Sequence, residues 1–151
     1  MQLYYFTPSE FRRDGVDWFK QMDGRLLVLL DTFRHEWGAK VSISAHPSAL
    51  GRHDGDKQSD HNVDLYGVVL AADVIPAGIA DRHDAETAIE IAKRIGFTSI
   101  GFYPDWHPAP GLHLGTRRDR VPGSPAIWGA VRPDPNAKQA YVSLDAALAR
   151  A

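Results

Sequence analysis

The sequence predicts a single α+β domain, in which a small antiparallel sheet is packed against helices that lie mainly on one face. Two segments place apolar residues at helical spacing, and several short segments are alternating or wholly apolar, as strands are. The chain has 151 residues, of which 44% are hydrophobic, and this is the size of one domain with one substantial core. We find no internal repeat and no low-complexity tract.

The helices are predicted from apolar stripes and from the residues that end them. Residues 8–11 open a short helix after the N-terminus. Residues 23–37 form a longer one that ends at Gly38, and residues 84–95 form another that ends at Gly96. A short terminal helix is capped by Ser143. The apolar faces of the two long helices are Leu26, Leu30, Phe33 and Trp37 in the first, and Ala85, Ala88, Ile89, Ala92 and Ile95 in the second.

The strands are predicted from short apolar or alternating segments bounded by turn residues. They cover residues 41–44, 68–75, 99–103, 111–116 and 126–132. Between the first two strands lies a long loop rich in Gly, Asp and His, and long structured loops are often functional. The turn residues from Pro133 to Asn136 break the chain, so the core is predicted to span about residues 9–132, with residues 133–151 as a C-terminal tail.

Composition excludes several classes of function. A net charge of −2 and a pI near 6.4 provide no basic field for nucleic acid. The absence of cysteine excludes disulfides and thiolate zinc ligands. The start of the chain lacks the basic and long apolar regions of a secretory signal, and the apolar run at residues 26–30 is far too short to span a bilayer. We therefore expect cytoplasmic synthesis without a signal peptide and no membrane insertion.

Three residues form a candidate metal site: His61, Asp73 and His113. Catalytic zinc typically binds three protein ligands and leaves the fourth position to water. Asp73 lies in an apolar run where an unpaired carboxylate is costly, and alternation places His113 opposite its flanking leucines. Ordinary alternatives are a turn cap for His61, a carboxylate satisfied by backbone donors or an arginine for Asp73, and a hydrogen-bonded core histidine for His113.

Four blocks of the chain together resemble peptidase family M15, and its phage-encoded branch most of all. They are Ser-Asp-His-Asn-Val-Asp-Leu-Tyr-Gly at residues 59–67, Ala-Ala-Asp-Val at 71–74, Gly-Phe-Tyr-Pro-Asp-Trp at 101–106 and Gly-Leu-His at 111–113. Members are zinc D-Ala-D-Ala carboxypeptidases and L-Ala-D-Glu endopeptidases with a hedgehog-like fold. The resemblance implies that His61, Asp73 and His113 bind zinc. Which peptide bond would be cut stays open.

The chain departs from the family pattern at two places. The stretch between His61 and Asp73 is longer than in most members and contains an inserted turn. Many members also carry an acidic or histidine residue two positions from the last ligand, whereas this chain has Gly111 and Gly115 there. We expect the missing side chain to cost a hydrogen bond that orients His113, which typically matters about 10- to 100-fold in metal affinity or activity.

The resemblance also implies roles outside the metal ligands. A general base must take a proton from the attacking water; Asp105 is the first candidate and His107 the second. An arginine upstream of the first ligand holds a peptide carboxylate, and Arg52 is the best placed, with Arg117 a weaker candidate. The ordinary alternatives are a turn residue after Pro104 for Asp105 and a solvated loop residue for Arg52.

The expected function is therefore zinc-dependent hydrolysis of an amide bond in peptidoglycan stem peptides, as part of phage-encoded cell-wall degradation. The alternative is a phage tail or virion protein, or a cell-wall-binding protein, that keeps the peptidase fold without turnover. The expected partners are a peptidoglycan peptide and, for a virion component, other tail proteins. The expected location is the virion or the host cytoplasm before lysis.

Overall fold

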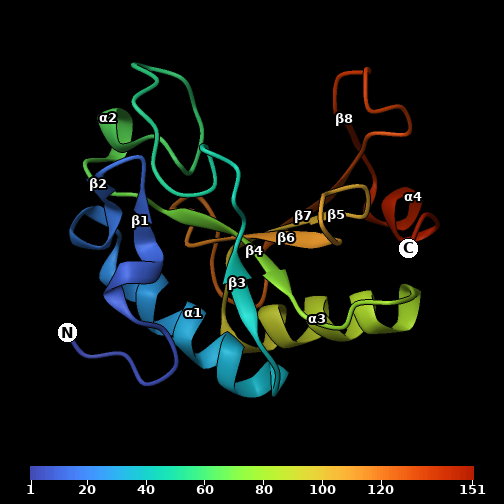
Figure 1. Cartoon of the computed structure of the whole chain (residues 1–151), viewed down its shortest axis with the longest axis horizontal. Helices are drawn as coiled ribbons and strands as arrows, with labels where there is room; N and C mark the ends of the chain where they lie inside the picture. The colour runs from blue at the N-terminus through green and yellow to red at the C-terminus, as the bar shows by residue number, and fades with distance from the viewer.

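The centre of the protein is a six-stranded mixed sheet, shown with its helices in Figure 1. The computed structural model describes all residues, 1–151. Neighbouring strands are antiparallel except β5 and β7, which run parallel. The predicted α+β fold of a single domain is confirmed. The strands lie in the order β3 (Val41–Ile43), β4 (Ala71–Pro76), β6 (Gly111–Gly115), β5 (Ser99–Tyr103), β7 (Ala126–Val131) and β8 (Ala140–Val142).

The parallel pair corrects the prediction of a wholly antiparallel sheet. Strand β6 runs back along β5 and ends with Gly115 beside Ser99, the first residue of β5. The chain then turns to the other side of β5, where Ala126 pairs with the same Ser99. Since β7 starts at the end of the sheet where β5 starts, it must run in the same direction as β5.

Helices α1 (Gly24–Trp37) and α3 (Arg82–Ile95) cover one face of the sheet (Figure 1). Asp23 caps α1 by accepting the N–H of Leu26, and Gly38 ends it in the left-handed conformation. Asp81 caps α3, which Gly96 ends. Both helices confirm the predicted segments, although α3 begins two residues earlier than expected.

Several short elements were not predicted. They are the hairpin of β1 (Arg12–Arg13) and β2 (Val16–Asp17), the 3₁₀ helix Trp18–Gln21, the helix α2 (Val63–Tyr66) and strand β8. Elements of two to four residues are too short to show a periodicity, which is why sequence patterns do not reveal them. The short helix at Pro8–Phe11 is present as a 3₁₀ helix.

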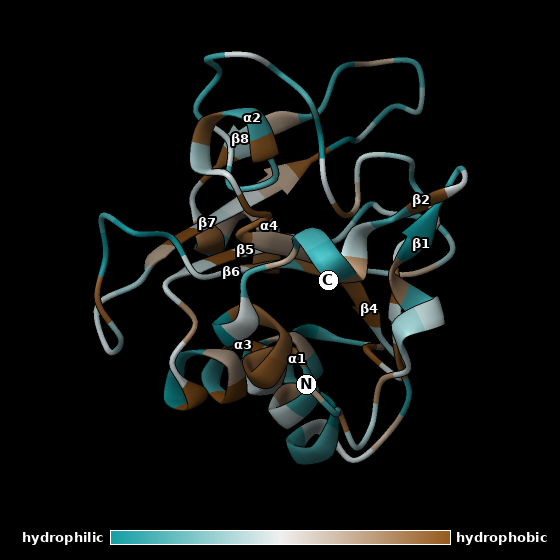
Figure 2. Cartoon of the chain, turned by 90° about the vertical axis from the view of Figure 1, so that its left-hand side faces the viewer, coloured by the Kyte–Doolittle hydropathy of each residue, from teal (hydrophilic) through white to brown (hydrophobic).

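The core lies between the sheet and the two long helices. Ala72 and Val74 of β4 and Leu112 and Leu114 of β6 belong to a cluster of 27 buried hydrophobic residues. Figure 2 shows hydrophobic residues, in brown, along β4 and β5 and on the helices below them. No helix is both long and apolar enough to cross a membrane. The opposite face of the sheet is left to polar side chains and loops.

The C-terminal segment is part of this core rather than a tail outside it. Helix α4 (Leu144–Leu148) buries Ala147 and Leu148 in the hydrophobic cluster. It approaches β7 so closely that a Cβ atom on Gly129 would lie 2.3 Å from the Cβ of Ala147. Residues 140–148 therefore complete the sheet edge and one side of the core.

One buried carboxylate, Asp31 of α1, ties down the N-terminus. It accepts the backbone N–H groups of Tyr4, Tyr5 and Phe6 at 2.9, 2.8 and 2.9 Å.

We expect Asp31→Asn to lower the free energy of unfolding by about 2 kcal/mol, because the amide group replaces one acceptor and removes the charge. Urea unfolding measures the loss. Asp145→Asn is the control, because the Asp145 carboxylate is 83% exposed. For this variant we expect the free energy of unfolding to change by less than about 0.5 kcal/mol. Equal midpoints for the two variants would contradict the prediction.

Candidate metal centre

Asp73 and His113 are direct neighbours on two antiparallel strands. The register pairs Asp73 of β4 with His113 of β6, so both side chains lie on the same face of the sheet. The flanking residues of each strand point into the core on the other face. The sheet therefore presents one carboxylate and one imidazole side by side on its polar face.

His61 reaches the same place from the loop before α2. Its backbone carbonyl accepts the N–H of Arg52 at 2.8 Å, and the carbonyl of Asp60 accepts the N–H of Leu70 at 2.8 Å. Asn62, which is fully buried, caps α2 and donates its amide to two loop carbonyls. These bonds hold the loop against the sheet and leave the His61 side chain 4% exposed.

The three predicted ligands converge. Oδ1 of Asp73 lies 3.2 Å from Nε2 of His61 and 3.3 Å from Nδ1 of His113. One ligand atom from each residue lies within 4.8 Å of the other two. The group of His61, Asp73 and His113 can therefore hold a metal ion, as the sequence predicts.

The hydrogen bonds around the two imidazoles leave each ring with one nitrogen lone pair, and this lone pair faces Asp73. Nδ1 of His61 contacts the carbonyl oxygen of Leu50, which can only accept, so Nδ1 carries the hydrogen. Nε2 of His113 contacts Oδ2 of Asp60 at 3.3 Å, so in the neutral ring Nδ1 is the free nitrogen. Metal-binding histidines are typically held by such a bond from the other ring nitrogen.

Oδ1 of Asp73 is buried and has no hydrogen-bond partner, although both imidazoles are near. With the tautomers above, it faces two nitrogen lone pairs and no donor. Three acceptors that meet without a proton between them repel one another, and a buried acceptor without a partner is costly. A cation at this point satisfies all three, so the donor set fits a metal ion.

The charges around His113 also favour a cation. Burial lowers the pKa of the His113 imidazole, but the carboxylates of Asp60 and Asp73 outweigh burial and raise it above the ordinary value, so without a metal a proton on Nδ1 can take the place of the cation between this ring and Asp73. Burial raises the pKa of Asp60, but the hydrogen bond with His113 and the charges of His113 and Arg117 bring it down to about 2. Burial also raises the pKa of Asp73, but His61 and His113 outweigh burial and hold it below the ordinary value. Both carboxylates are thus ionised, and the site attracts positive charge.

Asp60 and Ser99 orient His113. They supply the contact that was expected to be missing because Gly115 has no side chain. Oδ2 of Asp60 and Oγ of Ser99 both lie 3.3 Å from Nε2 of His113. A Cβ atom on Gly115 would lie 2.2 Å from the same Oγ of Ser99. The glycine therefore makes room for another partner, and His113 is held without a side chain at position 115.

We expect Asp60→Asn to weaken zinc binding by about 10- to 100-fold, because the amide no longer supplies the charge that polarises His113. Asp119→Asn is the matched control, since Asp119 also lies beside Arg117 but is 77% exposed. Competition with a chromogenic chelator measures both affinities. If the two variants bind zinc equally well, Asp60 does not tune the site.

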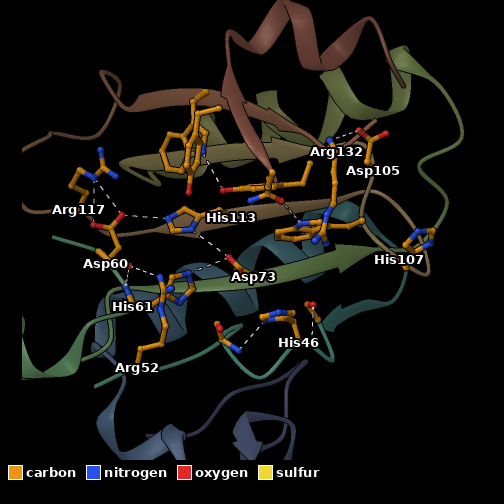
Figure 3. A pocket seen from close by; sticks show the side chains of 18 of the residues that line it. His46, Arg52, Asp60, His61, Asp73, Asp105, His107, His113, Arg117 and Arg132 are labelled. Atoms are coloured by element: carbon orange, nitrogen blue, oxygen red, sulfur yellow. Dashed lines mark hydrogen bonds and ion pairs between the residues drawn. The ribbon is translucent and has the colours of Figure 1, made fainter. Parts of the chain in front are cut away.

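The three ligands lie in a cleft of about 940 Å³. Figure 3 shows Asp60 and Arg117 at one end and Asp105 and His107 at the other. The lining is mostly polar and includes Ser44, His46, Ser59, Tyr103, Trp128 and Gln139. A metal in this cleft would be open to a ligand from solvent.

Asp105 and His107 line the cleft on the side away from Asp60 and His61 (Figure 3). The Asp105 carboxylate accepts hydrogen bonds from Arg150 at 2.7 Å and from the backbone N–H of Arg132 at 2.7 Å. The bond from Arg150, above all, holds the pKa of Asp105 below its ordinary value. A carboxylate in such an ion pair is a weak base, so the geometry does not favour Asp105 for proton transfer.

Arg52 and Arg117 both line the cleft. Arg52 donates from Nη2 to Ser59 at 2.6 Å, and its Nε lies 3.5 Å from Asp54. Arg117 lies over the Trp128 ring and contacts Asp60 through Nε at 3.3 Å. Nη1 of Arg52 makes no hydrogen bond within the protein, while Arg117 steadies the carboxylate behind His113.

Sequence reasoning missed the residues that support the ligands. Asp60 lies beside His61 in the block at residues 59–67, but no local pattern marks it as the partner of His113. Ser99, Tyr103 and Trp128 lie in predicted strands, and nothing in the sequence tells which of their strands is next to β6. Their roles depend on the sheet order, which the sequence does not show.

Comparisons of the chain with family models, with curated proteins and with solved structures found no match. The resemblance to peptidase family M15 is therefore a prediction from the sequence motifs alone.

Proposed function

We propose that the protein is a zinc-dependent peptidase that hydrolyses an amide bond in peptidoglycan stem peptides. The observation that carries the proposal is the buried Oδ1 of Asp73, which faces two imidazole lone pairs and has no donor. This arrangement lies in an open cleft, as a catalytic metal requires, rather than in the closed core.

Zinc suits this donor set better than other common ions. Two imidazoles and one carboxylate are borderline ligands that bind zinc well, whereas calcium and magnesium prefer oxygen ligands alone. When bound, the zinc ion supplies Lewis acidity, which polarises a carbonyl group and lowers the pKa of a water molecule. The protein supplies the orientation, through Leu50 behind His61 and through Asp60 behind His113.

The other cleft residues have proposed roles toward the peptide. Arg52 holds a substrate carboxylate, for which its free Nη1 and its partly exposed side chain are suited. Asp105 or His107 moves the proton from the water to the leaving amine. Asp105 can do so only after its ion pair with Arg150 opens, because both of its oxygens are engaged.

The biological setting is proposed from the M15 resemblance. The family motifs suggest phage-encoded cell-wall degradation, either by a free lysin or by a component of the tail. The competing function is a wall-binding or virion protein that keeps the metal site without turnover.

Two measurements on the same preparation test the proposal. Elemental analysis of protein purified without chelator should give one zinc per chain for the wild type and none for His113→Ala. The zinc-loaded wild type should release free amino groups from purified peptidoglycan, and His113→Ala should not. A wild type that takes up no zinc after zinc is added would refute the hydrolase mechanism. A zinc-loaded wild type that cosediments with peptidoglycan and releases no amines would support the binding function instead.

A further inference from the structure

Tyr103 brings a hydroxyl group to the cleft beside the metal centre. It is the last residue of β5 and pairs with Gly111 of β6, two residues from the pair of Gly101 and His113. Because side chains two residues apart on a strand share a face, Tyr103 lies on the same side of the sheet as His113. Its side chain lines the cleft, and the residue is 6% exposed.

Trp128 of β7 connects Tyr103 to the metal centre. Its ring centroid lies 5.0 Å from that of His113, and its Nε1–H donates to the Tyr103 hydroxyl at 3.2 Å. The contact depends on Gly101, where a Cβ atom would lie 2.7 Å from the indole. The indole therefore fills the space above Gly101, contacts His113 and holds the phenol oxygen at a defined place on the same face of the sheet.

The hydroxyl hydrogen of Tyr103 has no acceptor in the protein. Its oxygen accepts from Trp128, and it makes no other hydrogen bond. Buried hydroxyls normally have an acceptor for their hydrogen, so this donor is available to a ligand that enters the cleft. Burial also raises the pKa of the phenol well above its ordinary value, so the group stays a donor.

We propose that Tyr103 is a catalytic residue that donates a hydrogen bond to the carbonyl oxygen of the scissile amide as this oxygen gains negative charge. The inference rests on the proposed peptidase function and adds a residue to it. Water oxygen bonds to the carbonyl carbon, and the π electrons move onto the carbonyl oxygen, where Tyr103 stabilises them. The C=O double bond then re-forms as the C–N bond breaks, so the carbon keeps the water oxygen as a carboxyl group and the amine leaves with a proton that came from the water. Tyr103 keeps its own proton throughout.

The contrasting interpretation is that Tyr103 and Trp128 only pack the cleft wall. Both interpretations predict that Tyr103→Phe folds, because the ring and its packing remain and the one hydrogen bond lost within the protein is that from Nε1–H of Trp128. They differ in the effect that they predict on the reaction rate. Only if the hydroxyl donates to the substrate does its removal take away an interaction that strengthens as charge develops in the transition state.

The first test compares Tyr103→Phe with Tyr141→Phe, which removes a hydroxyl at the rim of the same cleft, where Tyr141 is 73% exposed. For Tyr103→Phe we expect kcat to fall about 100-fold with KM within about threefold, because a single donor to a developing oxyanion is worth roughly 10²- to 10³-fold. Zinc content should stay at one per chain. Tyr141→Phe should match the wild type in kcat, KM and zinc.

The second test is a binding measurement that needs no turnover. A dipeptide phosphinate, whose tetrahedral phosphorus carries charged oxygens in place of the scissile carbonyl, is titrated into zinc-loaded protein by calorimetry. Tyr103→Phe should weaken phosphinate binding by about 10- to 100-fold and leave binding of the cleaved peptide unchanged. Tyr141→Phe should bind both ligands as the wild type does.

The outcomes separate the two proposals. If the wild type is active and Tyr103→Phe retains its kcat and its phosphinate affinity, the role of Tyr103 is refuted and the peptidase stands. If zinc-loaded wild type neither cuts peptidoglycan nor binds the phosphinate, the peptidase function fails, and the role of Tyr103 fails with it.

Discussion

Asp73→Asn is expected to reduce zinc binding by at least about 100-fold, so that protein purified without chelator contains no zinc. Removing a hydrogen-bond partner of a metal ligand typically lowers the metal affinity about 10- to 100-fold, and removing the charge of the ligand itself lowers it more. The change is nearly isosteric, so the register that pairs Asp73 with His113 should persist. What is lost is the one anionic ligand, together with the buried acceptor that faces both imidazoles.

The matched control is Asp105→Asn. It makes the same chemical change in the same cleft, but at a carboxylate that Arg150 holds. We expect this variant to keep one zinc per chain. Elemental analysis and chelator competition measure both variants, and urea unfolding shows whether each is folded. One zinc per chain in a folded Asp73→Asn variant would remove Asp73 from the ligand set.

Gly115→Asp, which introduces the acidic residue common in the M15 pattern, is expected to damage the protein rather than to improve it. A Cβ atom at this position would lie 2.2 Å from Oγ of Ser99 and 3.0 Å from the carbonyl oxygen of Leu70. The added carboxylate would lie next to Asp60, which already occupies Nε2 of His113. We expect a loss of about 4 kcal/mol in the free energy of unfolding, from overpacking and from an unpaired buried charge.

Two further variants separate these causes. Gly115→Ala adds the Cβ atom without the charge and should cost about half as much. Gly24→Asp makes the same glycine-to-aspartate change in the first turn of α1, where negative charge is favourable, and should change stability by less than about 0.5 kcal/mol. Urea unfolding and zinc content are the measurements. If Gly115→Asp were as stable as the wild type and bound zinc more tightly, Asp60 would not be the working partner of His113.

The longer elements were predictable because their signals are local. The stripe from Leu26 to Trp37 repeats at helical spacing, and a capping residue and a glycine mark its ends, so α1 follows from the sequence with little help from the rest of the chain. The same holds for α3 and for the strand that carries His113. The two-residue strands near the N-terminus lack a repeat long enough to recognise.

The candidate ligands were predictable for a different reason. Asp73 is a carboxylate within an apolar strand, and His113 alternates with two buried leucines, so each is conspicuous against its neighbours. The supporting residues are not conspicuous. The contact between Asp60 and His113 joins residues 53 positions apart, and the ion pair between Asp105 and Arg150 joins residues 45 positions apart.

The sequence by itself determined the main helices and strands and the identity of three residues that can hold a metal. Only the tertiary structure decided that β7 runs parallel to β5, that Asp60 takes the place expected for a residue at position 115, and that Tyr103 shares a face of the sheet with His113. Periodicity and caps act over a few residues and are written in the local sequence. Sheet order and hydrogen bonds between distant residues depend on how the whole chain packs, because they arise only where segments far apart in the sequence are brought into contact.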